Sequence, residues 1–190
     1  MEFFVQREEK KSMWKEVFEW VQAIVVALVV AMFLRTYVFT LVDVSGSSMV
    51  PTLHDKDKLF VWRMANSYKP GDIIIFRPAA NKSTPYVKRV IATEGQSVDL
   101  RYNALEDCAE VYVDGEKLEE AYINEKINGS HIGDGTYPCV VPENCLFVLG
   151  DNRNNSSDSR ISTVGMVDVE SVIGEAKCRL WPISDIGGLK

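Results

Sequence analysis

The chain has 190 residues, of which 46% are hydrophobic and 25% are charged, a composition typical of a folded protein. This length suits one compact domain with a small additional element and excludes two full-sized domains. The formal net charge is -6, and no stripe of Lys and Arg stands out, so nucleic acid is not expected as a partner.

The clearest change in composition lies near the N-terminus. Residues 1–19 are polar and charged, whereas residues 20–38 form a mostly apolar segment. As a helix this segment would extend roughly 28 Å, close to the hydrocarbon thickness of a bilayer, so we predict a transmembrane anchor. A cleaved signal peptide and a buried core helix are the alternatives, since the uninterrupted apolar run, Ala23 to Leu34, is short. No small-x-small cleavage site directly follows the run, which favours an uncleaved anchor.

Basic side chains flank this segment unevenly. Four of them precede it, at Arg7, Lys10, Lys11 and Lys15. Arg35 alone lies close to its other end. The positive-inside bias therefore predicts that residues 1–19 are cytoplasmic and that residues 39–190 lie on the outer side of the membrane.

Short apolar runs separated by Gly, Pro, Asn and Asp follow Val38, which predicts a mainly β domain. The runs lie at residues 58–64, 71–76, 86–92, 96–100, 110–118 and 145–151. Asp114-Gly115, inside one of them, is a strong hairpin signal. Residues from about 102 to 144 are more polar and richer in Gly and Asn, and we expect a small inserted subdomain there.

Four cysteines lie in this domain, at Cys108, Cys139, Cys145 and Cys178. None forms a CxxC pair, which argues against a zinc site. Cys139 and Cys145 are close enough in the chain to close a small disulfide-bonded loop, or all four thiols are free and buried. The sequence leaves both arrangements open.

The loop Ser45–Leu53 (SGSSMVPTL) has the composition of a turn that could present a nucleophile. Gly46 permits an unusual backbone conformation, and Pro51 fixes the chain that follows Ser48. Backbone N–H groups beside Ser48 could then form an oxyanion hole. The alternative is a flexible Ser/Gly linker between the anchor and the domain.

Lys88 is the candidate base for this nucleophile. Strand alternation sends Lys88 and Arg89 to opposite faces, so we expect one to point inward and the other outward. Burial among apolar groups would lower the pKa of the amine enough for it to accept a proton. An isolated lysine is more commonly exposed on an edge strand. A Ser-His triad is the weaker alternative, because His54 and His131 both lie in polar, loop-like segments.

Residues 150–160 (GDNRNNSSDSR) combine charges, amides and hydroxyls directly after an apolar run. If this loop is buried, every one of these groups needs a hydrogen-bond partner. Asp158 could pair with Arg153 or Arg160, and Ser156 could orient a nearby amine. The alternative is a solvated surface turn.

Four segments together resemble the motifs of the bacterial type I signal peptidase family (leader peptidases). They are residues 48–53 (SMVPTL), which resemble the nucleophile motif SMxPTL; residues 71–76 (GDIIIF), which resemble the GD-plus-strand motif; residues 86–90 (YVKRV), which resemble the motif of the catalytic lysine; and residues 150–160, which resemble GDNRxxSxDSR. Their order behind one anchor matches the family through nearly the whole chain. The single anchor and short insertion resemble the smaller Gram-positive type.

The resemblance implies a Ser-Lys dyad, in which Ser48 attacks the scissile carbonyl carbon and neutral Lys88 takes its proton. It gives Ser156 the role of orienting the lysine. The loops of the site would be held by Asp158, Asp151 and Arg160. The lysine would be walled in by Met49, Phe76, Tyr86 and Val148. The substrate-binding positions would be Val42, Val44, Gly46, Met49, Tyr86 and Val87.

Two features depart from the family pattern. Some members carry an oxyanion-hole hydroxyl two residues before the nucleophile, where this chain has Gly46, so that backbone N–H groups or a neighbouring hydroxyl would complete the hole. The stretch from Ser159 to Gly165 also looks slightly longer than usual, which leaves the shape of this loop open.

The expected function is therefore that of a membrane-bound serine endopeptidase that removes N-terminal signal peptides from exported preproteins at Ala-x-Ala-like sites. The resemblance implies a signal-peptidase-like β core, a single pass through the bacterial cytoplasmic membrane and an extracytoplasmic catalytic domain. We expect a monomer without metal or cofactor, with preproteins and the lipid bilayer as partners.

The sequence allows alternatives for the surface of the domain and for its function. Leu59, Phe60, Trp62 and Trp181 are candidates either for lipid contact or for packing within the domain. A non-catalytic, membrane-anchored binding module of the same fold is the alternative function. A self-cleaving repressor-type peptidase would use the same chemistry, but the predicted anchor argues against it.

Overall fold

The structure is a computed structural model, and it describes residues 13–189. Residues 1–12, which include Arg7, Lys10 and Lys11 of the predicted cytoplasmic segment, lie outside the described residues. The chain divides into two compact units between Val38 and Phe39.

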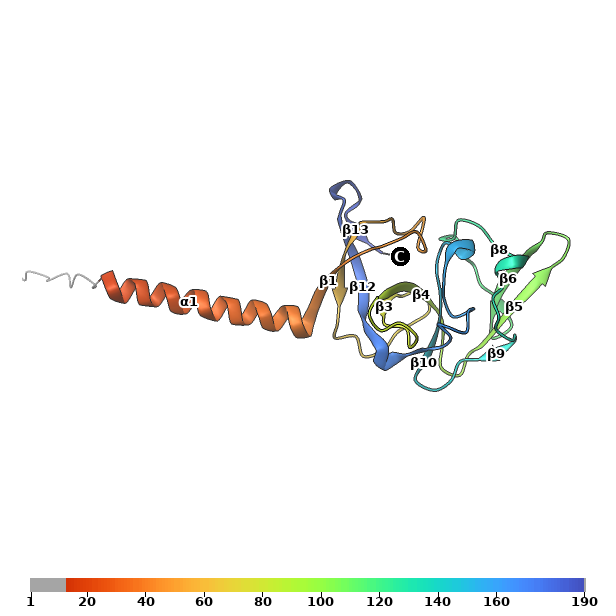
Figure 1. The fold of residues 1–190 in the computed structure, drawn as a ribbon, viewed down its shortest axis with the longest axis horizontal. Helices are drawn as coiled ribbons and strands as arrows, with labels where there is room; N and C mark the ends of the chain where they lie inside the picture. Colours follow the sequence, from red (N-terminus) through yellow and green to blue (C-terminus); the bar gives the residue numbers. More distant parts are fainter. Residues whose placement is uncertain (1–12, 190) are drawn as a thin grey trace, which may run out of the picture. The chain divides into compact units, whose positions relative to one another are not determined.

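The first unit is one helix, α1 (Met13–Phe33), which continues as a π-helical turn at Leu34–Val38 (Figure 1). Within residues 13–189, Met13–Val38 is the one helix that is long and apolar enough to cross a membrane. The helix begins before Trp20, where the predicted anchor starts, because residues 13–19 (MWKEVFE) mix apolar and charged side chains and contain no Gly or Pro that would end a helix. None of the side chains of α1 is buried by the protein, which is consistent with a membrane anchor.

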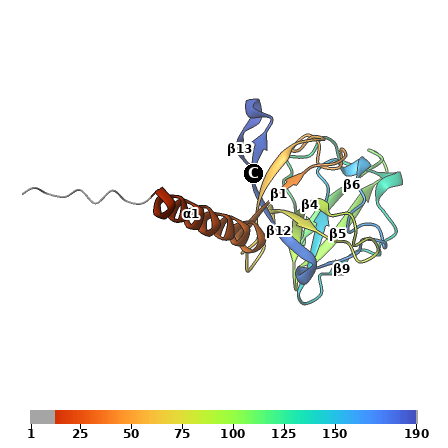
Figure 2. The ribbon, with the colours of Figure 1, turned by 60° about the vertical axis from the view of Figure 1, so that its left-hand side comes forward.

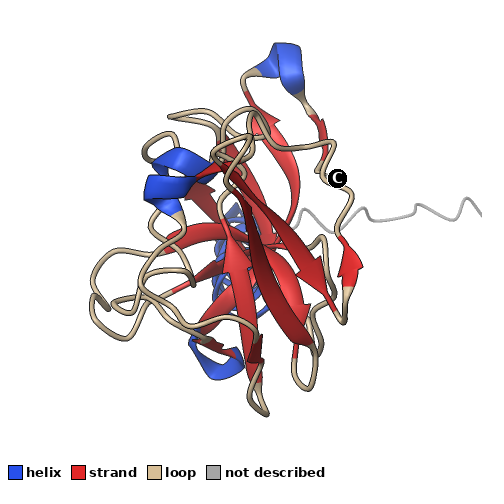
Figure 3. Cartoon of the chain, turned by 90° about the vertical axis from the view of Figure 1, so that its right-hand side faces the viewer, coloured by secondary structure: helices blue, strands red, loops and turns tan. Residues whose placement is uncertain are grey.

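The second unit contains a curled, eight-stranded antiparallel sheet (Figures 1 and 3). Its strands lie in the order β1-β2-β12-β3-β4-β10-β11, and β13 pairs with β12. They are β1 (Phe39–Asp43), β2 (Lys58–Trp62), β3 (Ile73–Phe76), β4 (Tyr86–Thr93), β10 (Cys145–Leu149), β11 (Val167–Asp168), β12 (Val172–Trp181) and β13 (Gly187–Gly188). Short 3-10 turns at Arg153–Asn155, Val169–Ser171 and Ile183–Asp185 connect or end these strands.

A smaller, five-stranded sheet lies on the side of this unit that is away from β12 and β13 (Figures 1 and 2). Its strand order is β7-β6-β5-β9, and β8 pairs with β6. The strands are β5 (Ser97–Asn103), β6 (Cys108–Val113), β7 (Glu116–Lys117), β8 (Ile127–Asn128) and β9 (Cys139–Val140), with a 3-10 turn at Gly129–His131. The sheet thus begins at Ser97, earlier than the predicted inserted subdomain. The predicted hairpin at Asp114-Gly115 is confirmed, since both residues have positive φ and join β6 to β7.

The predicted mainly β fold is confirmed, and each predicted run contains a strand. Sequence reasoning missed β1 and β12, although β12 is the longest strand and pairs with both β2 and β3. Gly174 and Glu175 conceal β12, because glycine and a carboxylate are uncommon inside a central strand. Both are buried, and the Glu175 carboxylate accepts a hydrogen bond from the Lys177 amine at 2.5 Å.

The four cysteines are free. Cys139 in β9 and Cys145 at the start of β10 both pack against the core of the smaller sheet. Of the two arrangements that the sequence left open, the structure has the one with free thiols.

Alternate residues of β3 contribute to two separate hydrophobic clusters. Ile73 and Ile75 pack with Met49 and Leu53 from the loop after β1. Ile74 and Phe76 pack on the other face, with valines from β4, β10 and β11. The core therefore fixes the loop that carries Ser48 and places Lys88, the partner of Ile74 on β4, over the second cluster.

Of the two alternatives given for Leu59, lipid contact or packing within the domain, the structure has packing, because Leu59 is fully buried in the first of these clusters. Trp181 is exposed, and Phe60 and Trp62 are partly buried.

Gly174 lies in β12 where the neighbouring strand leaves no room for a side chain. A Cβ added at this position would lie 2.5 Å from the backbone oxygen of Trp62, on the neighbouring strand β2. Gly174→Ala should therefore destabilise the protein by about 2 kcal/mol or more, as overpacking against a rigid backbone does. Thermal unfolding of the detergent-solubilised chain measures this. Gly187→Ala in β13 is the matched control, because no atom lies within 4 Å of its Cβ position. Equal melting temperatures for the two variants would contradict the prediction.

Candidate active site

A cleft of about 580 Å³ brings together three of the segments singled out in the sequence. Its lining consists of residues 43–49, residues 84–88 and residues 154–157. The first segment follows β1, the second leads into β4, and the third follows β10. Residues far apart in the chain thus meet in one concave surface.

Ser48 and Lys88 are hydrogen-bonded to each other in this cleft. Lys88 Nζ lies 2.7 Å from Ser48 Oγ and donates a second hydrogen bond of 3.0 Å to the carbonyl oxygen of Val87. Lys88 is only 4% exposed, whereas Ser48 is partly exposed and faces the cleft. The pair is therefore a hydroxyl that a ligand could reach, in contact with an amine that is almost removed from water.

Burial is the main influence on the protonation of Lys88. It lowers the pKa of the amine from 10.5 to about 8, against the opposing effect of the Asp158 and Asp151 carboxylates, and the Arg160 guanidinium assists the lowering. The ring of Tyr86 lies 5.4 Å from Nζ. About a tenth of the amine is then neutral at pH 7, and about half at pH 8, as a general base requires.

Arg89 and Asp151 form a buried ion pair behind the cleft. Arg89 donates from Nε and Nη2 to the two oxygens of Asp151, at 2.9 and 2.7 Å, and from Nη1 to the carbonyl oxygen of Gly71 at 2.9 Å. Thr52 Oγ1 donates to the same carboxylate at 2.5 Å, which ties the end of the Ser48 loop to it. The predicted outward orientation of Arg89 is wrong, because Arg89 is 1% exposed. The opposite face of β4 is covered by protein at this point, not by water.

Asp158 and Arg160 form a second buried pair. Arg160 donates from Nε and Nη2 to the Asp158 carboxylate at 2.8 and 2.9 Å, and Asp158 also accepts the backbone N–H of Gly150 at 3.0 Å. The remaining donor groups of Arg160 bind the carbonyl oxygens of His131 and Arg153. The charged side chains of the polar loop are therefore buried and paired, unlike those of a solvated turn.

Gly150 lets the polar loop approach the Ser48 loop. A Cβ on Gly150 would lie 2.5 Å from the carbonyl oxygen of Ser48 and would also meet the side chain of Ser156. The Ser156 hydroxyl lines the cleft and is buried, but it has no hydrogen-bond partner among the described residues. A buried hydroxyl without a partner destabilises the folded state by about 1–3 kcal/mol. The Ser156 hydroxyl is therefore free to form a hydrogen bond with another group at the site.

Two asparagines hold the Ser48 loop from the same side. Asn152 donates from its backbone N–H to the carbonyl oxygen of Ser48 and from Nδ2 to that of Ser47, both at 3.0 Å. Asn155 Nδ2 donates to the hydroxyl of Ser47 at 2.9 Å. Sequence reasoning singled out neither asparagine nor Thr52, although all three lie inside the motifs that it identified.

The predicted substrate-binding residues are mostly found in the cleft. Its lining includes Val44, Gly46, Met49, Tyr86 and Val87. Val42 is not part of the lining, because it packs against the core cluster of Met49 and Leu53. Phe76 and Val148 are fully buried in the cluster against which Tyr86 packs.

Gly46 has a φ of +89°, a conformation that suits glycine, and its N–H is bonded to Asp55 at 2.9 Å. This amide is therefore already occupied.

The two histidines lie away from this cleft. His54 and His131 are exposed, and neither belongs to its lining. The His131 ring is hydrogen-bonded to Ser130. No group of three His, Cys, Asp or Glu side chains within residues 13–189 is arranged to hold a metal ion.

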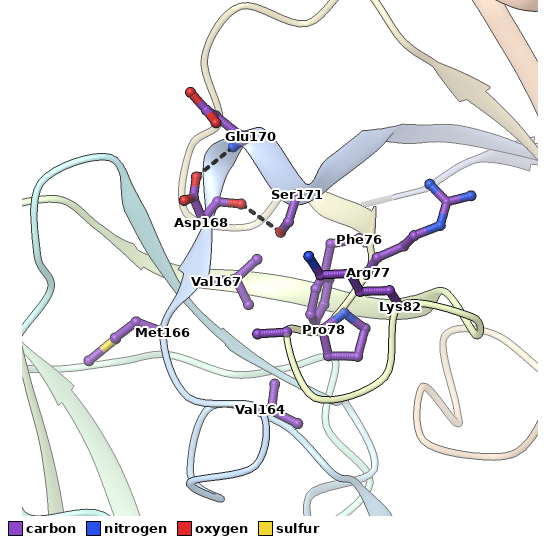
Figure 4. Close-up of a pocket in the computed structure, with 11 residues that line it drawn as sticks. Phe76, Arg77, Pro78, Lys82, Val164, Met166, Val167, Asp168, Glu170 and Ser171 are labelled. Atoms are coloured by element: carbon purple, nitrogen blue, oxygen red, sulfur yellow. Dashed lines mark hydrogen bonds between the residues drawn. The ribbon is translucent and has the colours of Figure 1, made fainter.

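A separate pocket of about 430 Å³ lies beyond β3 (Figure 4). Phe76, Val164 and Val167 form its apolar part, and the charged ends of Arg77 and Glu170 point away from them. The Ser171 hydroxyl is hydrogen-bonded to the backbone of Asp168. Neither Ser48 nor Lys88 lines this pocket, so the candidate chemistry is confined to the first cleft.

The chain is similar to known proteins over most of its length. A family model described as signal peptidase, peptidase S26, matches residues 17–181. A signal peptidase I of Bacillus licheniformis is 37% identical over 188 residues, which cover 94% of this chain and 97% of that protein. A signal peptidase IB of Staphylococcus aureus is 33% identical over 190 residues, which cover 91% of this chain and 94% of that protein. The crystal structure of a signal peptidase I from Enterococcus faecalis is 32% identical, with a TM-score of 0.46, and covers 58% of this chain and 97% of that chain.

Because the Lys88 amine is buried, we expect its substitution to change the stability of the protein by an amount that depends on pH. Lowering the pKa of Lys88 from 10.5 to about 8 costs the folded state of the order of 3 kcal/mol below pH 8, where the amine is charged in both states. Lys88→Met should therefore increase the free energy of unfolding at pH 7 by about 1–3 kcal/mol, since some lost hydrogen bonding offsets the gain. The gain should shrink as the pH rises from 8 toward 10.5, where the unfolded lysine also loses its proton.

Denaturant unfolding of both full-length proteins in detergent, at pH 7 and pH 10, measures this difference. A Lys88→Met variant that is no more stable at pH 7, or whose advantage grows toward pH 10, would contradict the assigned burial cost.

Proposed function

Since this chain belongs to the signal peptidase family, peptidase S26, and removes signal peptides as a serine protease, we propose that Ser48 and Lys88 are its catalytic dyad. The observation that carries this proposal is the 2.7 Å contact between Lys88 Nζ and Ser48 Oγ, made by an amine that is 4% exposed at the wall of a cleft. A neutral amine at hydrogen-bond distance from a hydroxyl is the arrangement that nucleophilic catalysis needs.

The acylation step follows from this geometry. Neutral Lys88 has two N–H groups and one lone pair; the Val87 carbonyl oxygen accepts one N–H, which leaves the lone pair free to face Ser48. As Ser48 Oγ attacks the scissile carbonyl carbon, Lys88 takes the hydroxyl proton and becomes an ammonium. It then gives this proton to the nitrogen of the leaving amine as the peptide bond breaks. The product is an ester between Ser48 and the signal peptide.

Hydrolysis of this ester repeats the same proton transfers with water. Lys88, neutral again, takes a proton from a water molecule that attacks the ester carbonyl carbon, and returns it to Ser48 Oγ as the signal peptide leaves. The backbone N–H of Ser48 would stabilise the oxyanion of both tetrahedral intermediates. The Gly46 N–H is committed to Asp55, so we assign the second contribution to the Ser47 hydroxyl, which Asn155 holds at the cleft.

Ser156, Asp151, Asp158 and Arg160 are supporting residues in this proposal. We assign the second N–H of Lys88 to Ser156, because its hydroxyl is buried at the same cleft and has no other partner among the described residues. Asp151 and Asp158 hold the two loops that meet at the dyad. Their carboxylates raise the pKa of Lys88, and the Arg160 guanidinium acts in the opposite direction.

The shape of the cleft supports a preference for small side chains. Val44, Met49, Tyr86 and Val87 contribute apolar lining to the cleft that contains Ser48, and Gly46 leaves room for a substrate backbone. Alanine-like residues at positions -1 and -3 of a preprotein would fit such a surface without displacing protein atoms. We therefore propose cleavage at Ala-x-Ala-like sites.

Residues 13–38 anchor the enzyme in this proposal, with the N-terminus in the cytoplasm and residues 39–190 on the outer side, where signal peptides of exported preproteins emerge. The uneven basic flanks support this orientation, although Arg7, Lys10 and Lys11 lie outside the described residues. The assignment of residues 1–19 as cytoplasmic and of residues 102–144 as an inserted subdomain belongs to the same proposal, as does action as a monomer.

Substitution of each dyad residue tests the mechanism. Ser48→Ala and Lys88→Ala should each reduce the cleavage of a preprotein with an Ala-x-Ala site at least about 1000-fold, because one removes the nucleophile and the other the base. Cleavage in detergent micelles, followed by gel electrophoresis, measures this loss. The melting temperature of each variant shows that it is folded.

His54→Ala and His131→Ala are the controls and should keep nearly full activity. Substantial cleavage by Lys88→Ala, or its loss in either histidine variant, would overturn the dyad. A wild-type chain that binds preproteins without cleaving them would favour the alternative of a non-catalytic binding module.

A further inference from the structure

A short connection between two strands of the smaller sheet contacts Arg153 and Arg89, two arginines that bind the loops of the active site. This segment, residues 118–123 between β7 and β8, is called the strap below. Its first residue, Leu118, packs against the core of the smaller sheet and donates its N–H to the Val111 carbonyl oxygen at 2.9 Å. Shortly after the strap, Ile127 is buried in the same core. Both flanks of the strap are therefore fixed.

Glu120 on the strap binds Arg153 of the polar loop with both carboxylate oxygens. Arg153 Nη1 lies 2.9 Å from Glu120 Oε2, and Nη2 binds Oε1. The two side chains are 9% and 1% exposed, so water contributes little to holding the guanidinium. Arg153 Nε donates to the carbonyl oxygen of Gly150 at 3.0 Å, and Gly150 is the residue that packs against Ser48. One side chain thus separates Glu120 from the contact between the two catalytic loops.

Tyr122 on the same strap covers Arg89. Its ring centre lies 4.0 Å from the guanidinium carbon of Arg89, which holds Asp151 and through it Thr52, at the end of the Ser48 loop. The Tyr122 hydroxyl also donates to Glu120 Oε1 at 3.3 Å. Burial, together with the Glu120 carboxylate, raises the pKa of Tyr122 to about 12, so this hydroxyl remains protonated.

We propose that Glu120 and Tyr122 are positioning residues for the reaction, which fix Arg153 and Arg89 and thereby the relative placement of Ser48 and Lys88. This inference rests on the proposed dyad. Neither residue belongs to the cleft lining, and neither lies in a motif that carries the family resemblance. Through the strap, the smaller sheet therefore contributes to catalysis without contact with substrate.

The expected signature is a loss of turnover without a loss of binding. The cleft walls that would hold the peptide do not include the strap, so KM should change less than about threefold. A misplacement of about 1 Å between nucleophile and base can cost a hundredfold in rate, so kcat should fall about tenfold to a hundredfold in Glu120→Gln. Tyr122→Leu, which removes the ring from Arg89, should lower kcat in the same way, whereas Tyr122→Phe should have a smaller effect because it keeps the ring.

The experiment compares Glu120→Gln with Glu119→Gln, its exposed neighbour in the strap, as full-length proteins in detergent. Cleavage of a model preprotein is measured at a temperature well below the melting temperature of every variant. Arg153→Lys and the double variant complete a cycle, since lysine keeps the positive charge but lacks the forked donor that reaches both Glu120 and Gly150.

If Glu120 acts through Arg153, the double variant should be no slower than the slower single variant. If Glu120 only stabilised the fold, its variants would have lower melting temperatures and an unchanged kcat. Additive losses in kcat, or a Glu120→Gln variant as active as Glu119→Gln, would overturn the inference. Lys88→Ala in the same assay separates the two proposals: its activity would refute the dyad, whereas its inactivity beside a fully active Glu120→Gln would refute the strap alone.

Discussion

The rest of the β unit is organised around one hydrogen bond, between the amine of Lys88 and the hydroxyl of Ser48. An amine can act as a base near neutral pH only if it is kept from water, and removal from water destabilises the folded protein. The hydrophobic cluster formed by β3, β4, β10 and β11 keeps the lysine dry, and the loop after β1 is fixed by the burial of Met49 and Leu53. Hydrophobic packing elsewhere in the core offsets the free-energy cost of burying this one amine.

Burial alone would not be sufficient, because two carboxylates lie close enough to Lys88 to favour its charged form. Asp151 and Asp158 are fully buried, and each is held by two hydrogen bonds from one arginine. Such forked pairs are rigid, and breaking one by removing a partner costs about 3–5 kcal/mol. The polar loop after β10 thus ties the loops of the site together. Arg160 from the same loop and Arg89 from β4 pair with the two carboxylates that this attachment introduces.

The sequence predicted the parts of this arrangement that depend on local patterns. Apolar runs located most of the main strands, and the motif order located Ser48, Lys88 and the polar loop. Alternation failed at Arg89, because it assumes that one face of a strand meets water, and here Tyr122 and Asp151 cover that face. β12 was missed because Gly174 and Glu175 are uncommon inside a strand, and the need for Gly174 follows from its contact with Trp62 on β2. Glu120 could not be found at all, since its role depends on a contact with a residue 33 positions away.

The ionisation of one side chain is the central claim, and it is directly measurable. In the full-length protein with ¹³C-labelled lysine, the Cε resonances report the titration of each amine, and the signal that is absent from Lys88→Met identifies Lys88. The structure predicts that this resonance titrates near pH 8, well below the ordinary lysine value of 10.5. A Lys88 resonance that titrates together with the exposed lysines would contradict the account, because the amine would then be too strongly protonated to serve as the base.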